Sequence, residues 1–357
     1  MPSPKKGLTV AVTGVSGYLG QGLVKRLAAD ASVERILGFD VRPPGASHPK
    51  LVFDEVDVRN PGLEARLEGV DCVVHLAFVM DPIRDEALMR DVNVNGSQNV
   101  FKAAGRAGVP RVVYASSATV YGAHPDNDVP MKETSPLRAN LDFSYAAHKL
   151  EVEYVVREIE EEFPGMHLVV LRPAIVFGSH VDNAWSHFLE LPALFGVAGH
   201  SPPLQLVHES DVARALQWAV TTEERGVFNL AADGWLDAEE ALSIAGRKRR
   251  LLPEPLAFAV AERMWSLGLS EAPPGYLHYA MHPWVVSTDK LAAAGFTSER
   301  GNAETLTEAV GAAAGHVRIG KARVRRGDLV RGAAAGLGLA GAAGLAVAMR
   351  ARRRSAA

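Results

Sequence analysis

Short apolar segments alternate with longer stretches of helical periodicity as far as about residue 180. Continuous apolar runs of this length predict strands buried on both faces, and the intervening periodicity predicts helices that cover them. The predicted strands are 8–12, 34–40, 51–53, 72–78, 112–115 and 168–171, and the clearest helices are 21–27, 88–105 and 145–163. This alternation predicts an α/β fold with a Rossmann-type, doubly wound parallel sheet. In such sheets ligands bind beyond the carboxyl ends of the strands.

The pattern loosens from about Ser179 onward, where Pro, Trp and His become more frequent. We expect residues 1–178 to form the cofactor-binding core and residues 179–315 to form mostly a smaller C-terminal substrate lobe. The chain would return from this lobe to the main sheet at about 206–230. Residues 316–357 form a basic tail rich in Gly and Ala.

Composition narrows the class of protein. A formal net charge of −3 over 357 residues gives no sign of nucleic acid as a partner. The single cysteine, Cys72, rules out an internal disulfide and fits a reducing compartment. The N-terminus runs directly into the first predicted strand, so no secretory signal is visible. We therefore expect a cytoplasmic folded body.

A Gly-rich turn, Thr13–Gly20, lies between the first predicted strand and the helix that follows it. One glycine of such a turn permits the tight bend, one lets the backbone approach a pyrophosphate, and one allows close helix–strand packing. These glycines are Gly14, Gly17 and Gly20. The helix N-terminus adds unpaired N–H groups and a favourable dipole for phosphate. The turn predicts a dinucleotide site.

Asp40 ends the second predicted strand, twenty residues after Gly20. Folds of this kind place there the carboxylate that accepts hydrogen bonds from the adenosine ribose. A carboxylate repels a 2′-phosphate, so NAD is favoured over NADP. Arg42 could bind that phosphate, which keeps NADP as the weaker alternative.

Tyr145 and Lys149 are four residues apart on a predicted helix, so their side chains share one face. A free tyrosine titrates near about 10, and a neighbouring ammonium with a charged nicotinamide would favour the phenolate. Ser117 follows the strand 112–115, where its hydroxyl could hydrogen-bond a substrate oxygen held beside the tyrosine. The three side chains together predict proton transfer coupled to oxidation or reduction at a carbinol.

The order and spacing of these motifs resemble those of the extended short-chain dehydrogenase/reductases. That family includes NAD-dependent epimerases and dehydratases and 3β-hydroxysteroid dehydrogenases. The resemblance covers residues 7 to about 310 and rests on the Gly-rich turn, Val73–Ala77, Asn93–Gly96, Ser117, Tyr145 with Lys149, and Leu171–Pro173.

The resemblance implies a role for each matching residue. Tyr145 would be the general acid/base, Lys149 would lower its pKa and hold the nicotinamide ribose, and Ser117 would orient the substrate oxygen. The remaining implied cofactor contacts are Gly14, Gly17 and Gly20 with the amides of Tyr18 and Leu19 at the pyrophosphate, Asp57 and Val58 beside the adenine, Ala77 after the fourth strand, Asn93 as a brace of the active site, and Pro173 near the nicotinamide. Relatives often dimerise through the helix that bears the Tyr-Lys pair, so a homodimer is also implied.

Departures from the family pattern bear on the substrate. Sugar 4,6-dehydratases carry Thr-Asp-Glu where this chain has Ser117-Ala118-Thr119, so dehydration is not expected. Nucleotide-sugar epimerases usually place an arginine on the substrate diphosphate where Leu204 stands here. The lobe segments are also apolar, which favours a small sterol- or isoprenoid-like alcohol or ketone. A nucleotide-sugar epimerase remains the alternative, and a non-catalytic NAD(P)-binding sensor or scaffold is the alternative of another class.

His75 and His208 lie in apolar contexts typical of core histidines, and no cluster has metal-ligand spacing, so we predict no metal. The tail holds an uncharged run, 332–349, with basic residues on both sides. Its length nearly matches a bilayer core, but its Gly and Ala content makes insertion marginal. Membrane spanning, surface contact through residues 321–354 and a disordered tail are equally compatible with the sequence.

Overall fold

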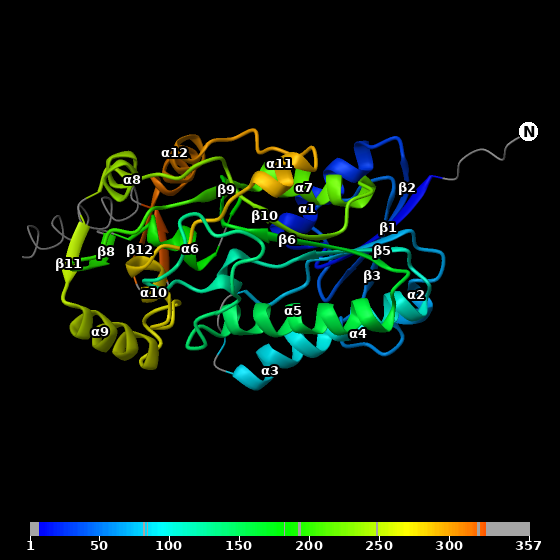
Figure 1. Ribbon diagram of the computed structural model, residues 1–357, viewed down its shortest axis with the longest axis horizontal. Coiled ribbons are helices and arrows are strands. Elements are labelled where there is room, and N and C mark those ends of the chain that lie inside the picture. The colour runs from blue at the N-terminus through cyan, green and yellow to red at the C-terminus, as the bar shows by residue number, and fades with distance from the viewer. Residues whose placement is uncertain are drawn as a thin grey trace, which may run out of the picture.

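A parallel seven-stranded sheet forms the centre of the molecule (Figure 1). The computed structural model describes residues 7–80, 83, 85–181, 183–191, 194–247, 249–319 and 322–325. Across the sheet the strands are β10 (Gly226–Leu230), β6 (His167–Pro173), β5 (Arg111–Ala115), β4 (Cys72–His75), β1 (Leu8–Thr13), β2 (Val33–Asp40) and β3 (Leu51–Glu55). Every neighbouring pair is parallel. The predicted doubly wound, Rossmann-type sheet is confirmed.

Helices cover both faces of the sheet. On one face α1 (Tyr18–Ala29) packs against α7 (Glu209–Thr221), and on the other α4 (Gly96–Arg106) packs against α5 (Ser144–Glu162) (Figure 1). Because successive side chains of a strand point to opposite faces, Val10 and Val12 enter the core under α1, and Ala11 enters the core under α4 and α5. The two cores account for the near-continuous apolar strands of the sequence.

Strand order reverses on either side of β1, which has β4 on one flank and β2 on the other. The segments that leave the carboxyl ends of β1, β2, β4 and β5 therefore lie along one edge. These segments carry the Gly-rich turn, Asp40, Ala77 and Ser117. The topology thus brings the candidate residues to one edge.

Outside the main sheet and the helices named above, the chain forms small pairs of strands and further helices. The strand pairs are β7 (Ile175–Phe177) with β9 (Leu206–His208), β8 (Leu194–Val197) with β11 (Arg249–Leu252), and β12 (His316–Ile319) with β13 (Ala322–Arg325). The remaining helices are α2 (Leu63–Arg66), α3 (Glu86–Arg90), a π-helical turn at Asp91–Asn95, a 3₁₀ turn at Ala118–Tyr121, α6 (Ala184–Phe188), α8 (Ala238–Ala245), α9 (Glu254–Ser266), α10 (Tyr276–Met281), α11 (Asp289–Ala293) and α12 (Asn302–Ala313). Between these elements the chain returns to the main sheet: α7 packs against α1, and β10 pairs with β6, whereas β9 pairs with β7.

A third core, rich in aromatic side chains, lies where these added elements meet the carboxyl edge of the sheet. Phe143, Tyr276, Tyr279 and Trp284 are buried in it.

None of the helices in the described part of the chain is long and apolar enough to cross a bilayer. The uncharged run 332–349 lies outside the described residues.

Candidate active site

The Gly-rich turn fits closely against the end of β4. Gly14 has a φ of +70°, which favours glycine, and a Cβ placed on it would lie 2.6 Å from the backbone nitrogen of Ala77. A Cβ on Gly20 would collide with the carbonyl oxygen of Gly14. Gly17 caps α1 and donates its N–H to that same carbonyl at 3.1 Å. Larger residues at Gly14 and Gly20 would force the turn open, so the tight bend requires glycine there.

Asp40 lies beside this turn at the end of β2. Its carboxylate accepts hydrogen bonds from the backbone N–H of Ser16 at 3.0 Å and of Arg42 at 3.3 Å. The Arg42 carbonyl in turn accepts the Ser16 hydroxyl at 2.5 Å. The acid is thus fixed at the rim of the glycine turn, as a ribose-binding carboxylate requires.

Asp57 and Val58 follow β3 on the same edge. Hydrogen bonds from Arg59, at 2.7 Å from Nη2 and 2.8 Å from the backbone N–H, lower the pKa of Asp57. Val58 is buried, and a Cβ on Gly96 would lie 2.6 Å from its Cγ2. Asp57 therefore carries a charge here, and Val58 offers an apolar surface against α4.

Buried polar groups tie β1, β4 and the helices behind the site together. His75 is 1% exposed and lies between the Thr13 hydroxyl, 2.7 Å from Nδ1, and the Ser97 hydroxyl, 2.8 Å from Nε2. Burial lowers the pKa of His75 to about 3, so the ring is neutral. Asn93 is fully buried, and its amide pairs with the backbone of Val79 at 2.7 and 3.0 Å. Asn93 thus fixes the segment that follows β4.

Ser117, Tyr145 and Lys149 line one cleft together with Tyr18, Leu19 and Pro173. Ser117 lies just beyond β5, and its hydroxyl oxygen accepts hydrogen bonds from the Thr119 amide and hydroxyl at 3.2 and 3.0 Å. Tyr145 and Lys149 project from the first turns of α5. Asp40, Asp57, Val58 and Asn93 lie outside this cleft lining. The structure therefore joins the candidate acid/base group to the residues at the start of α1.

The electrostatics of the pair differ from those that the spacing suggests. Burial raises the pKa of Tyr145 to about 12, although a hydrogen bond with Ser117 opposes this rise. The Lys149 ammonium donates to the Ala115 carbonyl at 2.6 Å and lies 3.6 Å from the centre of the Phe78 ring, against 5.7 Å from that of Tyr145. With the protein's own groups alone, the Lys149 ammonium thus lies over the ring of Phe78 rather than beside the Tyr145 phenol. Burial is therefore the main influence on the pKa of Tyr145.

Lys149 itself is 4% exposed, and burial lowers its pKa to about 7, while Glu153 opposes the shift. We expect Lys149→Met to stabilise the cofactor-free protein most at pH below 7. Between about 7 and 10.5 the unfolded chain holds a proton that the folded chain has released, so wild-type stability rises with pH across this window. The advantage of the variant should therefore shrink, as measured by urea unfolding at several pH values. An advantage that stays constant across the window would contradict this assignment.

The spacing of the Tyr-Lys pair extends to a third member that sequence reasoning missed. Glu153 is four residues beyond Lys149 on α5, is 3% exposed, and accepts hydrogen bonds from Ser116 Oγ at 2.6 Å and Arg172 Nε at 2.8 Å. Arg172 Nη1 also contacts the Tyr121 hydroxyl at 2.6 Å. This network connects α5 to the ends of β5 and β6 directly behind the cleft. The four-residue spacing of Glu153 from Lys149 is visible in the sequence, but the sequence gives no sign that Arg172 of β6 is its partner.

The opposite wall of the cleft is aromatic. Phe143, Trp185, Tyr276 and Trp284 line it, and the rings of Phe143 and Tyr276 are 4.4 Å apart, with Trp185 4.7 Å from Tyr276. Leu204 forms a β-bridge with Leu236 and packs against this aromatic core. Among the described residues that line the cleft, Lys149 alone is charged.

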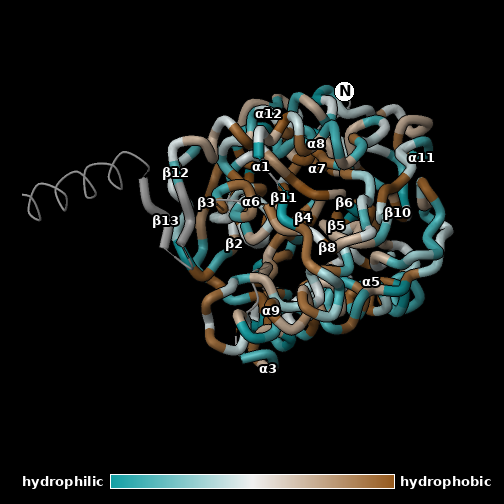
Figure 2. Tube along the Cα trace, turned by 90° about the vertical axis from the view of Figure 1, so that its left-hand side faces the viewer, coloured by the Kyte–Doolittle hydropathy of each residue, from teal (hydrophilic) through white to brown (hydrophobic). Residues whose placement is uncertain are grey.

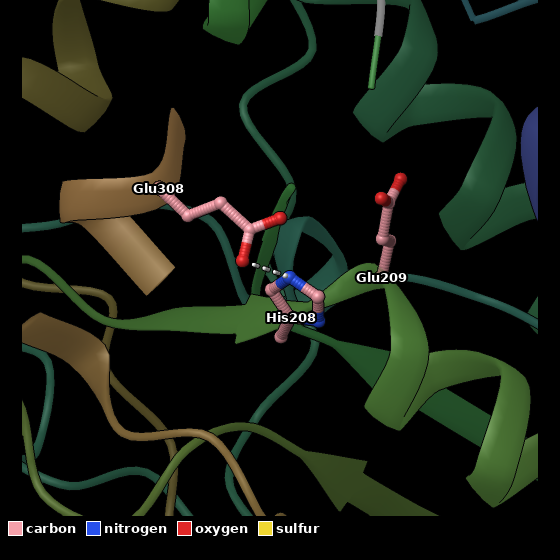
Figure 3. A group of neighbouring side chains, drawn as sticks. All are labelled: His208, Glu209 and Glu308. Atoms are coloured by element: carbon pink, nitrogen blue, oxygen red, sulfur yellow. Dashed lines mark ion pairs between the residues drawn. The ribbon is translucent and has the colours of Figure 1, made fainter. Parts of the chain in front are cut away.

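A separate cluster near the start of α7 has the residue types of a metal site. Ligand atoms of His208, Glu209 and Glu308 lie within 4.8 Å of one another, and Nε2 of His208 faces the Glu308 carboxylate at 3.3 Å (Figure 3). However, Nδ1 of His208 accepts the Ser210 backbone N–H at 3.1 Å. A neutral ring then carries its proton on Nε2, which favours an N–H facing the carboxylate over a metal bond. The absence of a metal stays a prediction.

Comparisons with known proteins agree with this geometry. The family model described as "NAD dependent epimerase/dehydratase family" matches residues 10–231. An uncharacterized protein of Mycobacterium tuberculosis is 32% identical over 253 residues, which are 68% of this chain and 67% of that protein.

Solved structures show the same fold. The Thermus thermophilus UDP-glucose 4-epimerase with NAD has a TM-score of 0.67 at 23% identity and covers 86% of this chain and 99% of its own. MoeE5 with UDP-glucuronic acid and NAD has a TM-score of 0.68 at 23% identity, and the match covers 85% of this chain and 98% of MoeE5. The family resemblance predicted from the motifs is confirmed: this chain belongs to the NAD-dependent epimerase/dehydratase family of enzymes.

Proposed function

We propose that the protein is an NAD-dependent oxidoreductase or epimerase that transfers hydride at a secondary alcohol or ketone of a small apolar substrate. One observation carries the proposal. Ser117, Tyr145 and Lys149 line a single cleft whose other wall is aromatic and uncharged. Such a cleft combines a proton donor and acceptor with a surface that favours sterol- or isoprenoid-like molecules.

The residues present fit NAD as the resident cofactor. Gly14, Gly17 and Gly20 place no Cβ in the bend before α1, where the N–H groups of Tyr18 and Leu19 would bind the pyrophosphate. Asp40, at the rim of this bend, would accept hydrogen bonds from the ribose hydroxyls. By resemblance, Asp57 and Val58 would border the adenine, Ala77 would lie along the cofactor, and Pro173 would lie near the nicotinamide. When bound, NAD supplies the hydride acceptor.

Proton transfer falls to the protein's own residues. Ser117 would hold the substrate oxygen by a hydrogen bond, and Tyr145 Oη, as phenolate, would accept the hydroxyl proton while the carbinol carbon loses hydride. Reduction returns the proton from Tyr145 to the substrate oxygen. Lys149 would bind the nicotinamide ribose and oppose the rise in the Tyr145 pKa that burial causes.

Asp40→Ser is expected to weaken NAD binding and to improve NADP binding, so that the preference between them falls at least about tenfold. The variant removes the carboxylate that repels a 2′-phosphate and leaves Arg42 two residues away. Titration of both cofactors by intrinsic fluorescence measures the ratio, and Asp54→Ser, an acid of the neighbouring strand β3 that pairs with Arg66 and has no assigned role at the cofactor, is the matched control. An unchanged ratio in Asp40→Ser would remove this carboxylate from the site.

Substrate class is tested by a screen that compares sterols, other apolar alcohols and UDP-glucose with NAD. The readouts are nicotinamide absorbance for net oxidation and the sugar product for epimerisation. We expect turnover of an apolar alcohol, because Leu204 and the aromatic wall offer no cation to a diphosphate. Turnover of UDP-glucose alone would favour the alternative, a nucleotide-sugar epimerase, which is the activity for which the Thermus thermophilus protein of similar fold is named.

Two further expectations remain proposals. A homodimer through α5 and its neighbouring helix is supported by Tyr154, a large apolar side chain of α5 that is 46% exposed. A cytoplasmic location is supported by the single buried thiol, Cys72. If NAD binds but no substrate of any class turns over, a non-catalytic sensor or scaffold becomes the better description.

A further inference from the structure

Helix α9 exposes a row of large apolar side chains. Leu256, Val260 and Met264 follow one another at four-residue spacing, and Leu267 continues the same face just after the helix. Their exposed fractions are 49%, 43%, 38% and 51%. The inward face packs against the protein through Ala257 and Phe258. A helix that is apolar on its outward face as well as on its inward one is typical of an interaction site.

The strand pair β8–β11 extends this surface. Phe195 of β8 is 60% exposed and Leu251 of β11 is 52% exposed. Arg250 is the register partner of Phe195. Figure 2 looks onto this end of the molecule, where α9, β8 and β11 lie together. We call these exposed residues of α9, β8 and β11 the α9 surface.

Basic residues accompany the α9 surface. The chain enters β11 through the run Arg247-Lys248-Arg249-Arg250, and segment 247–269 has five basic residues against two acidic ones although the whole chain has a net charge of −3. Arg250 is exposed. Apolar side chains bordered by arginine are the combination that attracts a protein to an anionic lipid surface.

We propose that the α9 surface rests on an anionic membrane. The C-terminal segment is the competing occupant, because its uncharged run 332–349 could cover the apolar row. Its flanks, however, carry Lys321, Arg323 and Arg326 on one side and Arg350 to Arg354 on the other. These have the same sign as the run beside β11, so the two segments repel each other and are both attracted to anionic lipid.

The test is co-sedimentation of the full chain with phosphatidylcholine vesicles, with and without phosphatidylglycerol. We expect binding only to the anionic vesicles and a loss of that binding at high salt. Val260→Glu with Met264→Glu should weaken binding at least about tenfold, because both carboxylates would have to enter the apolar part of the membrane in their charged form. Val52→Glu with Leu141→Glu is the matched control, since these side chains are 47% and 77% exposed on other elements. Circular dichroism and NAD binding verify that each variant is folded.

Three outcomes would overturn the proposal. The full chain could fail to bind anionic vesicles. The α9 variant could bind as tightly as wild type, which would assign all binding to the tail. Finally, wild type could form a dimer in sedimentation equilibrium that the α9 variant abolishes while vesicle binding is unchanged, which would assign this surface to a second copy of the chain. None of these results bears on hydride transfer at Tyr145.

Discussion

Tyr145→Phe is expected to lower kcat by about three orders of magnitude or more while leaving NAD binding nearly unchanged. The substitution removes only the hydroxyl, which is the titratable group of the cleft that shares a hydrogen bond with Ser117. The ring remains to pack against Phe78 and Phe143, whose centroids are each 5.6 Å away. Single-turnover absorbance of the nicotinamide, with the best substrate of the screen, measures the effect.

A matched control separates the loss of proton transfer from the loss of a hydroxyl. Tyr276→Phe makes the same atomic change in another tyrosine of the same cleft and should lower kcat by less than about tenfold. Because burial holds the Tyr145 pKa high, at about 12 with the protein's groups alone, kcat/KM for oxidation should rise with pH. A Tyr145→Phe enzyme with more than about a tenth of wild-type activity would mean that another group moves the proton.

The sheet was predictable because its strands are buried on both faces and therefore read as continuous apolar runs. β1, β4, β5 and β6 each overlap a predicted segment, and the glycines between β1 and α1, in combination with the motifs that follow them, indicated the family. Local spacing also sufficed for Tyr145 and Lys149, because both side chains belong to one helix face. What the sequence could not provide are contacts between segments far apart in the chain.

Two such contacts change the picture of the site. Phe78 takes the Lys149 ammonium on its ring, although the two residues are far apart in sequence and no short-range pattern links them. Arg172 reaches Glu153 only because β6 lies next to β5 and α5 covers both. The spacing rule places Lys149 near Tyr145, but burial and these neighbours decide where its charge lies. Sequence motifs therefore located the groups, and long-range packing determined their electrostatics.

Glu153→Ala is expected to lower the free energy of unfolding by about 3–5 kcal/mol. The side chains of Glu153 and Arg172 are 4% and 3% exposed and form an ion pair. Removal of the carboxylate leaves the guanidinium buried without a counter-charge and takes the acceptor from Ser116 Oγ. Urea unfolding of the full chain measures the change, and the slope of the transition verifies that the folded states are comparable.

The same helix supplies the control. Glu151→Ala breaks the ion pair with Arg90, whose side chains are 38% and 49% exposed, and should cost less than about 1 kcal/mol. Glu153→Met with Arg172→Met removes both charges and should recover most of the lost stability, because the penalty arises from the unpaired partner. A loss below about 1 kcal/mol in Glu153→Ala would show that water or Tyr121 compensates Arg172.

Because the Glu153 carboxylate also opposes the effect of burial on Lys149, Glu153→Gln should lower the Lys149 pKa further, so that its ammonium is lost at a lower pH than in the wild type.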